Sequence, residues 1–335
     1  MNKLNTLVTG VGAEIGQGIV KALRLSRYDC EITGCDANPD SAGFFMCDDY
    51  CKVSRAESPD YLDKIVDICR SKNIKLLFPA VDAELRILSE NKLLFENINT
   101  TVIVQPNELL NIFLSKYNTY KFLQKHGISA PLTLFTNSQK NIAEITARLS
   151  FPLIIKPDFG QGSKNLYLVH SRKRLALYLQ LIEDEKYVVQ QYLPAEDEEY
   201  TCAIFNCNYL QEPFVMAFKR RLVEGVSGIA EVSFDREIVS VCNKVSESSN
   251  LEGAINIQLR QFRGKSFIFE INPRFSSTVG IRAKCGFNDV EMAIDYFLFG
   301  KTPLKPSVHR KKILRYKEEI YLDMENTNRV WKHKA

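Results

Sequence analysis

The sequence predicts an α/β protein in which a parallel sheet is followed by a region of mixed helices and antiparallel strands. Two observations predict this fold class. Apolar segments of strand length alternate with helical segments over the first 110 residues, which is the pattern of a parallel sheet with helices on both faces. The 335 residues then leave room for one or two further units with their own cores.

The chain opens with an apolar strand, Leu4 to Val8, which enters a turn containing Gly10, Gly12 and Gly16. A helix and a second strand follow, and that strand ends at Asp36. A glycine turn followed by an acid about twenty residues on is typical of dinucleotide sites, although the third glycine here comes a residue late. The elements expected next are helices at 19–25, 61–71 and 82–91 and strands at 31–35, 75–79 and 101–104.

The helix that follows allows two interpretations. Tyr117 and Lys121 have the Y-x-x-x-K spacing, which puts both side chains on one face of a helix. Together with the glycine turn and Asp36, this spacing would indicate an NAD(P)-dependent oxidoreductase of the short-chain type, and we keep that alternative open. The same helix closes at Gly127, a good C-cap residue, and Pro131 prevents its continuation.

A lysine ends the next apolar strand. Lys156 follows a run of buried-type residues, and a buried ammonium needs an anion at its tip because burying an unpaired charge is costly. A phosphate would supply that anion. The loop that follows contains Gly160, Gly162 and Ser163, and its glycines allow backbone N–H groups to approach phosphate oxygens closely.

The stretch 253–282 is expected to begin with an antiparallel hairpin, because two segments with strand patterns flank a short turn. In such a hairpin Gln258, Glu270 and Asn272 point toward one face, since side chains alternate along a strand. Their carboxylate and amide oxygens suit Mg²⁺. Arg274 follows at once, placed to neutralise charge on a transferring phosphoryl group.

These elements, in this order, resemble the ATP-grasp superfamily, and most closely its carbamoyl-phosphate-synthetase-like branch. The resemblance covers the chain from residue 4 to residue 305. The lysine-ended strand and the hairpin are its most specific parts. It implies a Rossmann-like N-terminal domain at 1–110, a small lid subdomain at 111–190 and a large subdomain with the metal site at 191–335.

The resemblance also implies roles for single residues. The nucleotide would be held by phosphate-binding lysines, the glycine loop, an adenine segment and a ribose-binding acid: Lys116, Lys156, Gly160, Gly162, Ser163, Gln190, Gln191, Leu193 and Glu199. Relatives commonly carry glutamate where Gln191 stands. The metal ligands would be Gln258, Glu270 and Asn272, and the catalytic or substrate-binding cations would be Arg274, Lys219, Arg221 and Arg282.

The activity implied is that of a carboxylate–amine ligase, which forms an amide through an acyl phosphate and releases ADP and phosphate. Such a reaction depends on positioning and on charge neutralisation. The cofactors would be ATP and Mg²⁺, with Mn²⁺ as an alternative metal, and the partners a small-molecule carboxylate and an amine. Carbamoyl phosphate synthesis itself fits less well, because the chain has one ATP-grasp copy and Ser277 where synthetases carry a second arginine. A non-catalytic nucleotide-binding module is the remaining alternative.

Composition indicates an ordinary soluble protein of the cytoplasm. Lys and Arg number 44 against 40 Asp and Glu, and the resulting net charge of +4 is too small to suggest nucleic acid or a membrane surface as a partner. The start does not have the pattern of a signal peptide, and no apolar run approaches the ~20 residues of a membrane span. The nine cysteines lack zinc-site spacing and are expected to be free thiols. A homodimer is left open.

Overall fold

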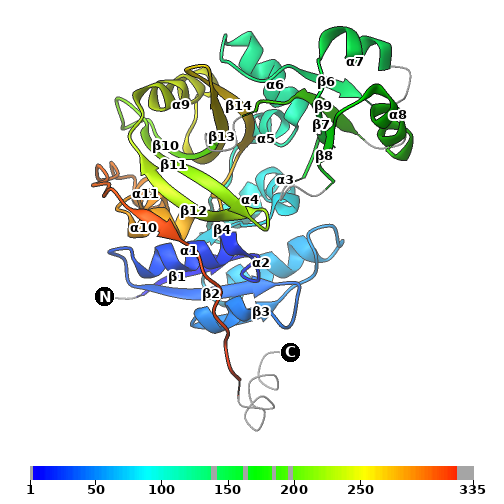
Figure 1. The fold of residues 1–335 in the computed structure, drawn as a ribbon. Coiled ribbons are helices and arrows are strands. Elements are labelled where there is room, and N and C mark those ends of the chain that lie inside the picture. Colours follow the sequence, from blue (N-terminus) through cyan, green and yellow to red (C-terminus); the bar gives the residue numbers. More distant parts are fainter. Residues whose placement is uncertain (1–2, 137–141, 161–164, 183–185, 195–198, 323–335) are drawn as a thin grey trace.

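The computed structural model describes residues 3–136, 142–160, 165–182, 186–194 and 199–322. They form one parallel sheet and two antiparallel sheets. In Figure 1 the parallel sheet, drawn in blue, lies at one end of the molecule, and the two antiparallel sheets lie side by side at the other. The predicted fold class, a parallel-sheet domain followed by antiparallel sheets with helices, is confirmed.

The N-terminal sheet has the strand order β3-β2-β1-β4-β5, with every neighbouring pair parallel. Leu7 and Val8 on the central strand are fully buried, as expected where helices cover both faces. The strands are β1 (Leu4–Val8), β2 (Cys30–Asp36), β3 (Asp49–Lys52), β4 (Leu76–Phe78) and β5 (Thr101–Val102). The helices are α1 (Glu14–Arg24), η1 (Ala42–Met46), α2 (Tyr61–Ser71), α3 (Asp82–Glu90) and α4 (Lys92–Glu96).

The acid at the end of β2 forms hydrogen bonds with the backbone around the glycine turn after β1. One carboxylate oxygen of Asp36 accepts the Gly12 N–H at 2.7 Å, and the other accepts the Asn38 N–H at 2.8 Å. A side chain at Gly16 would come within 2.4 Å of the Gly10 carbonyl oxygen, so this glycine allows α1 to pack closely on the turn. The acid that a dinucleotide-binding protein would use for ribose is therefore bonded to the turn, which disfavours the oxidoreductase alternative.

The small antiparallel sheet has the order β6-β9-β7-β8 and carries two helices. Its core contains Leu153 and Ile155 of β7 together with Leu175 and Leu179 of the second helix. The strands are β6 (Thr133–Thr136), β7 (Leu153–Pro157), β8 (Tyr167–Val169) and β9 (Tyr187–Gln191), and the helices are α7 (Ile142–Arg148) and α8 (Arg172–Leu181).

The large antiparallel sheet has the order β14-β13-β10-β11-β12-β15. One face packs on helix α9, where Ile238 and Val245 join Ile257 in a common core. On the other face, Phe205 and Phe218 belong to a cluster that continues into the N-terminal sheet. The strands are β10 (Glu199–Asn206), β11 (Phe214–Val223), β12 (Val226–Ser233), β13 (Gly253–Phe262), β14 (Lys265–Asn272) and β15 (Lys312–Leu314), and α9 spans Arg236–Ser249.

Short helices complete the fold. Helix α6 falls in the range 111–190 that we expected to form the lid, and its Leu123 belongs to the same hydrophobic cluster as Ile257 of the large sheet. Helix α10 begins at Val279, shortly after the hairpin. The remaining elements are α5 (Asn107–Phe113), α6 (Lys116–Lys125), α10 (Val279–Lys284), α11 (Asp289–Ala293) and the π-helical turn η3 (Ile294–Leu298).

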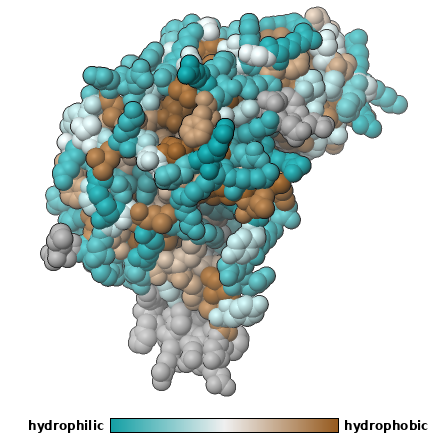
Figure 2. Space-filling view, turned by 60° about the vertical axis from the view of Figure 1, so that its left-hand side comes forward, coloured by the Kyte–Doolittle hydropathy of each residue, from teal (hydrophilic) through white to brown (hydrophobic). Residues whose placement is uncertain are grey.

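Figure 2 shows a face on which hydrophilic residues predominate and apolar residues gather only in small groups. Among the described residues, no helix combines the length and the apolar character that crossing a membrane requires.

Candidate functional site

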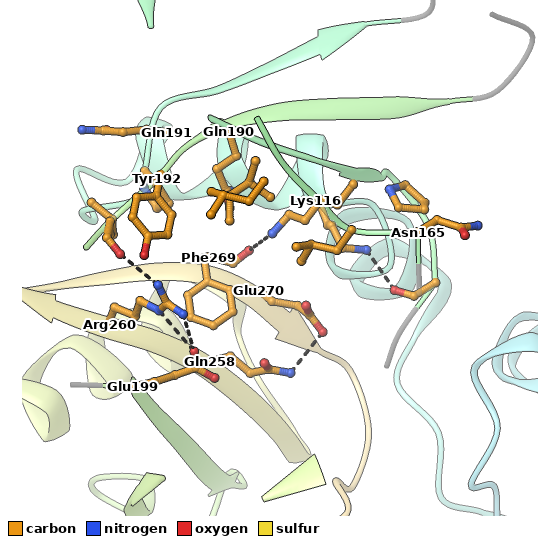
Figure 3. A pocket seen from close by; sticks show the side chains of 18 of the residues that line it. Lys116, Asn165, Gln190, Gln191, Tyr192, Glu199, Gln258, Arg260, Phe269 and Glu270 are labelled. Atoms are coloured by element: carbon orange, nitrogen blue, oxygen red, sulfur yellow. Dashed lines mark hydrogen bonds and ion pairs between the residues drawn. The ribbon is translucent and has the colours of Figure 1, made fainter. Parts of the chain in front are cut away.

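A cavity of about 710 Å³ lies between the small sheet and the large sheet, a volume within the range of small-molecule sites. Figure 3 shows its two sides: Lys116 and Gln190 point in from the side of the small sheet, and Gln258 and Glu270 point in from the hairpin β13–β14. Basic and amide groups thus face a carboxylate across the cavity.

Lys156 lies at the end of β7 and reaches the cavity from its strand. It is 5% exposed, and burial lowers the pKa of its ammonium from 10.5 to about 8. Nζ lies 3.4 Å from the carbonyl oxygen of Phe269 and 5.4 Å from the centroid of that ring, a contact that favours the cation. Within the described part of the chain no carboxylate pairs with this ammonium, so an anion entering the cavity would supply the missing partner.

Lys116 occupies the first turn of α6, where the helix start is fixed by Asp158. The Asp158 carboxylate accepts the Ser115 hydroxyl at 2.8 Å and the Tyr117 N–H at 2.8 Å. Nζ of Lys116 donates to the carbonyl oxygen of Gly160 at 2.9 Å. Both expected phosphate-binding lysines therefore line one cavity, together with the first glycine of the loop. Gly162 and Ser163 lie outside the described residues.

The segment expected to bind adenine forms another part of the cavity wall. Gln190 is buried and its amide nitrogen donates to the Thr133 hydroxyl at 2.8 Å. Gln191 is exposed, and its backbone N–H donates to the Leu132 carbonyl at 2.8 Å. Gln190, Gln191 and Leu193 all line the cavity.

The three expected metal ligands lie together on the hairpin. One oxygen of Glu270 accepts N–H groups from both neighbours, Gln258 at 3.1 Å and Asn272 at 3.0 Å. Gln258 and Glu270 line the cavity, while Asn272 is buried next to them. Among the described residues there is no cluster of three or more His, Cys, Asp or Glu side chains, so this oxygen-bearing group carries a single formal charge.

A β-bulge brings an additional side chain to this face. Gln258 pairs with Glu270, but the next pair is Leu259 with Ile268, so Phe269 has no cross-strand partner of its own. An extra residue on one strand reverses the alternation beyond it. Ile268 is consequently buried in the core, whereas Phe269 and Glu270, adjacent in sequence, both line the cavity.

Three charged residues form a row across adjacent strands β13, β10 and β11. Arg260 donates to one oxygen of Glu199 at 3.1 and 2.8 Å, and Arg220 donates to the other oxygen at 3.1 and 2.9 Å. Arg260 also donates to the Leu193 carbonyl at 2.8 Å, and Arg220 to the Gln258 side-chain oxygen at 2.6 Å. Sequence reasoning selected Glu199 and missed both arginines.

The two cations of β11 that we predicted to serve the site, Lys219 and Arg221, point away from this row. Lys219 pairs in register with Glu231 on β12, and Arg221 is exposed. Because side chains alternate along a strand, the residue between them, Arg220, is the one that faces Glu199. Neither Lys219 nor Arg221 is among the described residues that line the cavity, and their role in substrate binding stays a prediction. The position of Glu199 would have indicated which side chains of β11 face the row, because β10 pairs with β11.

Two models of known protein families match different parts of the chain. A family model described as "PylC-like, N-terminal domain" matches residues 6–103. A second, described as "ATP-grasp in the biosynthetic pathway with Ter operon", matches residues 183–320, which include β13, β14 and the residues discussed on them. The prediction of an ATP-grasp module is confirmed by the second of these matches.

Relatives of the chain include carbamoyl phosphate synthase large chains. That of Methanosarcina mazei is 24% identical over 311 residues, which make up 84% of this chain and 28% of the relative, so the chain spans less than a third of that protein. Among solved structures, N5-carboxyaminoimidazole synthetase from Staphylococcus aureus in complex with ADP gives a TM-score of 0.71 at 15% identity, covering 93% and 81% of the two chains. L-amino acid ligase from Bacillus licheniformis gives 0.66 at 16% identity, covering 92% and 75%.

Two further arginines, both within the ATP-grasp match, were expected to be catalytic. Arg274 is 7% exposed, forms an ion pair with Asp82 at the start of α3 and donates to the Asn272 side-chain oxygen at 3.2 Å. It thus lies beside the oxygen ligands. Arg282 is fully buried and bonds to Asp289 at 2.9 Å through Nε, away from the cavity lining. This enclosure favours a structural role for Arg282, and its catalytic role stays a prediction.

Proposed function

We propose that the protein is an ATP- and Mg²⁺-dependent carboxylate–amine ligase, which forms an amide through an acyl phosphate and releases ADP and phosphate. One observation carries the proposal: Lys116 and Lys156 face Gln258 and Glu270 across a single cavity of about 710 Å³. The lysines supply positive charge for phosphates, and the opposite wall supplies hard oxygen ligands. The names of the similar proteins, which include two synthetases or synthases and an L-amino acid ligase, support this class of reaction.

The donor set fits Mg²⁺. Gln258 and Asn272 both approach the same oxygen of Glu270, at 3.1 and 3.0 Å, so one carboxylate and two amide side chains, all of which carry oxygen, converge at that point. A site with one formal charge suits an ion that keeps waters and takes its other ligands from phosphates. When bound, the ion would neutralise charge on the phosphate oxygens.

The reaction proposed here has two balanced steps. A carboxylate oxygen of the first substrate attacks the terminal phosphorus of ATP, and the bond to the bridging oxygen breaks, releasing ADP. The amine then attacks the acyl carbon, inorganic phosphate leaves, and the amine loses a proton. Lys116 and Lys156 would hold the phosphates, and Arg274, beside Asn272, would stabilise charge near the oxygen ligands.

The organisation and the setting of the ligase are part of the same proposal. The N-terminal domain would extend to about residue 110, and the remaining chain would supply the lid and the large subdomain that enclose ATP.

All nine cysteines fall within the described residues, and each is a free thiol. Free thiols suit a reducing compartment, which supports a cytoplasmic location.

The test is a screen for product release. The purified chain is incubated with ATP, Mg²⁺ and pooled carboxylates and amines, and nucleotides are separated by chromatography. We expect ADP and phosphate to form only when both substrates are present, and Glu270→Gln to abolish the signal. Accumulation of AMP would exclude the acyl-phosphate route. Stabilisation by ATP without turnover on any substrate pair would favour a binding module, and stabilisation by NADH or NADPH instead of ATP would favour the oxidoreductase.

A further inference from the structure

The row Arg260–Glu199–Arg220 leaves Glu199 without acceptor capacity. An ionised carboxylate has two oxygens with about four lone-pair sites. Oε2 receives two N–H groups from Arg260, and Oε1 receives two from Arg220. All four sites are occupied by charge-assisted hydrogen bonds, so no site is left for a hydroxyl group of a ligand.

This arrangement follows from the sheet itself. Glu199 pairs in register with Arg260 on β13, and the pair Tyr200–Lys219 puts Arg220 opposite Glu199 on β11. Opposite charges at directly facing positions on one face attract each other. The three side chains are thus brought together by strand register and need no ligand to assemble them.

Displacing either arginine is unfavourable. The side chains of Arg220 and Glu199 are only 8% and 10% exposed, and Arg260, at 25%, is also held by the Leu193 carbonyl. Removing one partner would leave a charge without its bonds in a poorly hydrated place. A ribose hydroxyl is a neutral donor, and its hydrogen bond is weaker than the bidentate one that it would replace.

Resting on the proposed nucleotide site, we propose that Glu199 does not bind the ribose of ATP and that the cavity therefore selects weakly between ribose and deoxyribose. Among the described residues that line the cavity, Glu270 is the other carboxylate, and it belongs to the oxygen group on the hairpin. The cavity then accepts ATP, 2′-deoxy-ATP and 3′-deoxy-ATP with dissociation constants within about threefold of one another.

The experiment is a competition titration with Mg²⁺, in which the three nucleotides displace a fluorescent ATP analogue from the full chain. Ratios of dissociation constants below about threefold support the inference, and a larger preference for ATP overturns it. Failure of all three nucleotides to displace the probe, with no direct binding of ATP by calorimetry, overturns the proposed function and the inference with it. Tight binding of ATP with strong selection against the deoxy nucleotides would be a different result, because it would overturn the inference and leave the proposed function standing.

A second variant tests the cause. Arg260→Met keeps the length of the side chain but frees one oxygen of Glu199, so ATP should gain a preference over 2′-deoxy-ATP or 3′-deoxy-ATP of about tenfold, typical of a hydrogen bond to a charged group. Arg263→Met, an exposed change in the turn of the same hairpin, is the matched control and should leave the ratios unchanged. An unchanged ratio in a folded Arg260→Met variant would show that saturation by Arg260 is not the cause.

Discussion

Lys156 of the small sheet contacts Phe269 of the large sheet, with Nζ 3.4 Å from the carbonyl oxygen and 5.4 Å from the ring centroid. The contact joins the two walls of the cavity, and it exists because a bulge turns Phe269 toward the lysine. A buried ammonium with a ring and a carbonyl as neighbours is poised to accept an anion. The first two predictions follow from this arrangement.

Lys156→Ala should weaken ATP binding itself, because the ammonium would meet phosphate in the bound ground state. We expect the dissociation constant to rise by about tenfold to a hundredfold, the range for losing a hydrogen bond to a charged group. Lys125→Ala removes the same charge from an exposed position on α6 and should have no effect. Calorimetric titration of both variants checks this. Equal affinities would place the phosphates elsewhere.

The same lysine should make stability depend on pH. Its pKa is about 8 in the folded protein against 10.5 ordinarily, so between these values the unfolded chain binds more protons and stability rises with pH. The cost of the buried charge is present below about pH 8 and is relieved toward pH 10.5. Lys156→Met should therefore be more stable than wild type by roughly 3 kcal/mol near neutral pH. Urea unfolding should show this advantage shrinking as the pH rises; a constant difference would contradict it.

Glu270→Gln should separate chemistry from nucleotide binding. It removes the single formal charge of the oxygen group while keeping its shape, so turnover should fall by about a hundredfold or more, roughly 3 kcal/mol. Binding of ATP without metal should be retained. Glu231→Gln, an exposed change on β12 where the carboxylate pairs with Lys312, controls for the charge. Steady-state rates at several Mg²⁺ concentrations test this prediction. Normal turnover by Glu270→Gln would show that Glu270 is not a metal ligand.

Arg274→Ala should reduce turnover by a similar factor with little change in ATP affinity, because its cation acts where charge develops. Asp82→Ala tests how Arg274 is held, since the two form an ion pair between α3 and the hairpin. We expect a smaller loss of turnover in Asp82→Ala, with KM for ATP unchanged. If Arg274→Ala stays within about threefold of wild type, Arg274 only connects the two domains.

Arg282→Ala should act on stability and leave the chemistry of the folded protein intact. The change would strand the buried Asp289, whose pKa is already raised by burial, and breaking such a pair costs about 3–5 kcal/mol. The double variant Arg282→Met/Asp289→Leu should recover much of that loss, because it removes both charges. Urea unfolding gives the stabilities, and turnover per folded molecule should match wild type. Loss of turnover without loss of stability would instead support a catalytic role for Arg282.

Much of the fold followed from periodicity. The alternation of apolar and polar residues in the hairpin was enough to bring Gln258, Glu270 and Asn272 together, because facing positions on paired strands share a face. The bulge at Phe269 left no such signal, since one extra residue does not change the composition of a strand. The same limit explains Arg220: a run of three cations does not reveal which of them faces inward until the neighbouring strand is known.

Sequence reasoning did not predict the ion-pair partners of Arg274 and Arg282. Arg282 and Asp289 form a buried pair through a helix and a turn, and Arg274 meets Asp82 from a different domain. Neither carboxylate stands in a pattern that points to its arginine. Both arginines follow a hairpin of oxygen ligands, which favours a catalytic role for each, and only their packing distinguishes them.

The bulge in β14 also bears on chain length. Ile268 packs in the core and Glu270 faces the cavity, although residues two apart on a regular strand share one face. The extra residue between them is Phe269, so a hairpin lacking it would keep Glu270 opposite Gln258 and Ile268 opposite Leu259. A shorter relative could thus retain every oxygen ligand while its lysine loses the aromatic neighbour. An alignment that allows no gap at Phe269 would match Glu270 with the wrong residue of such a relative.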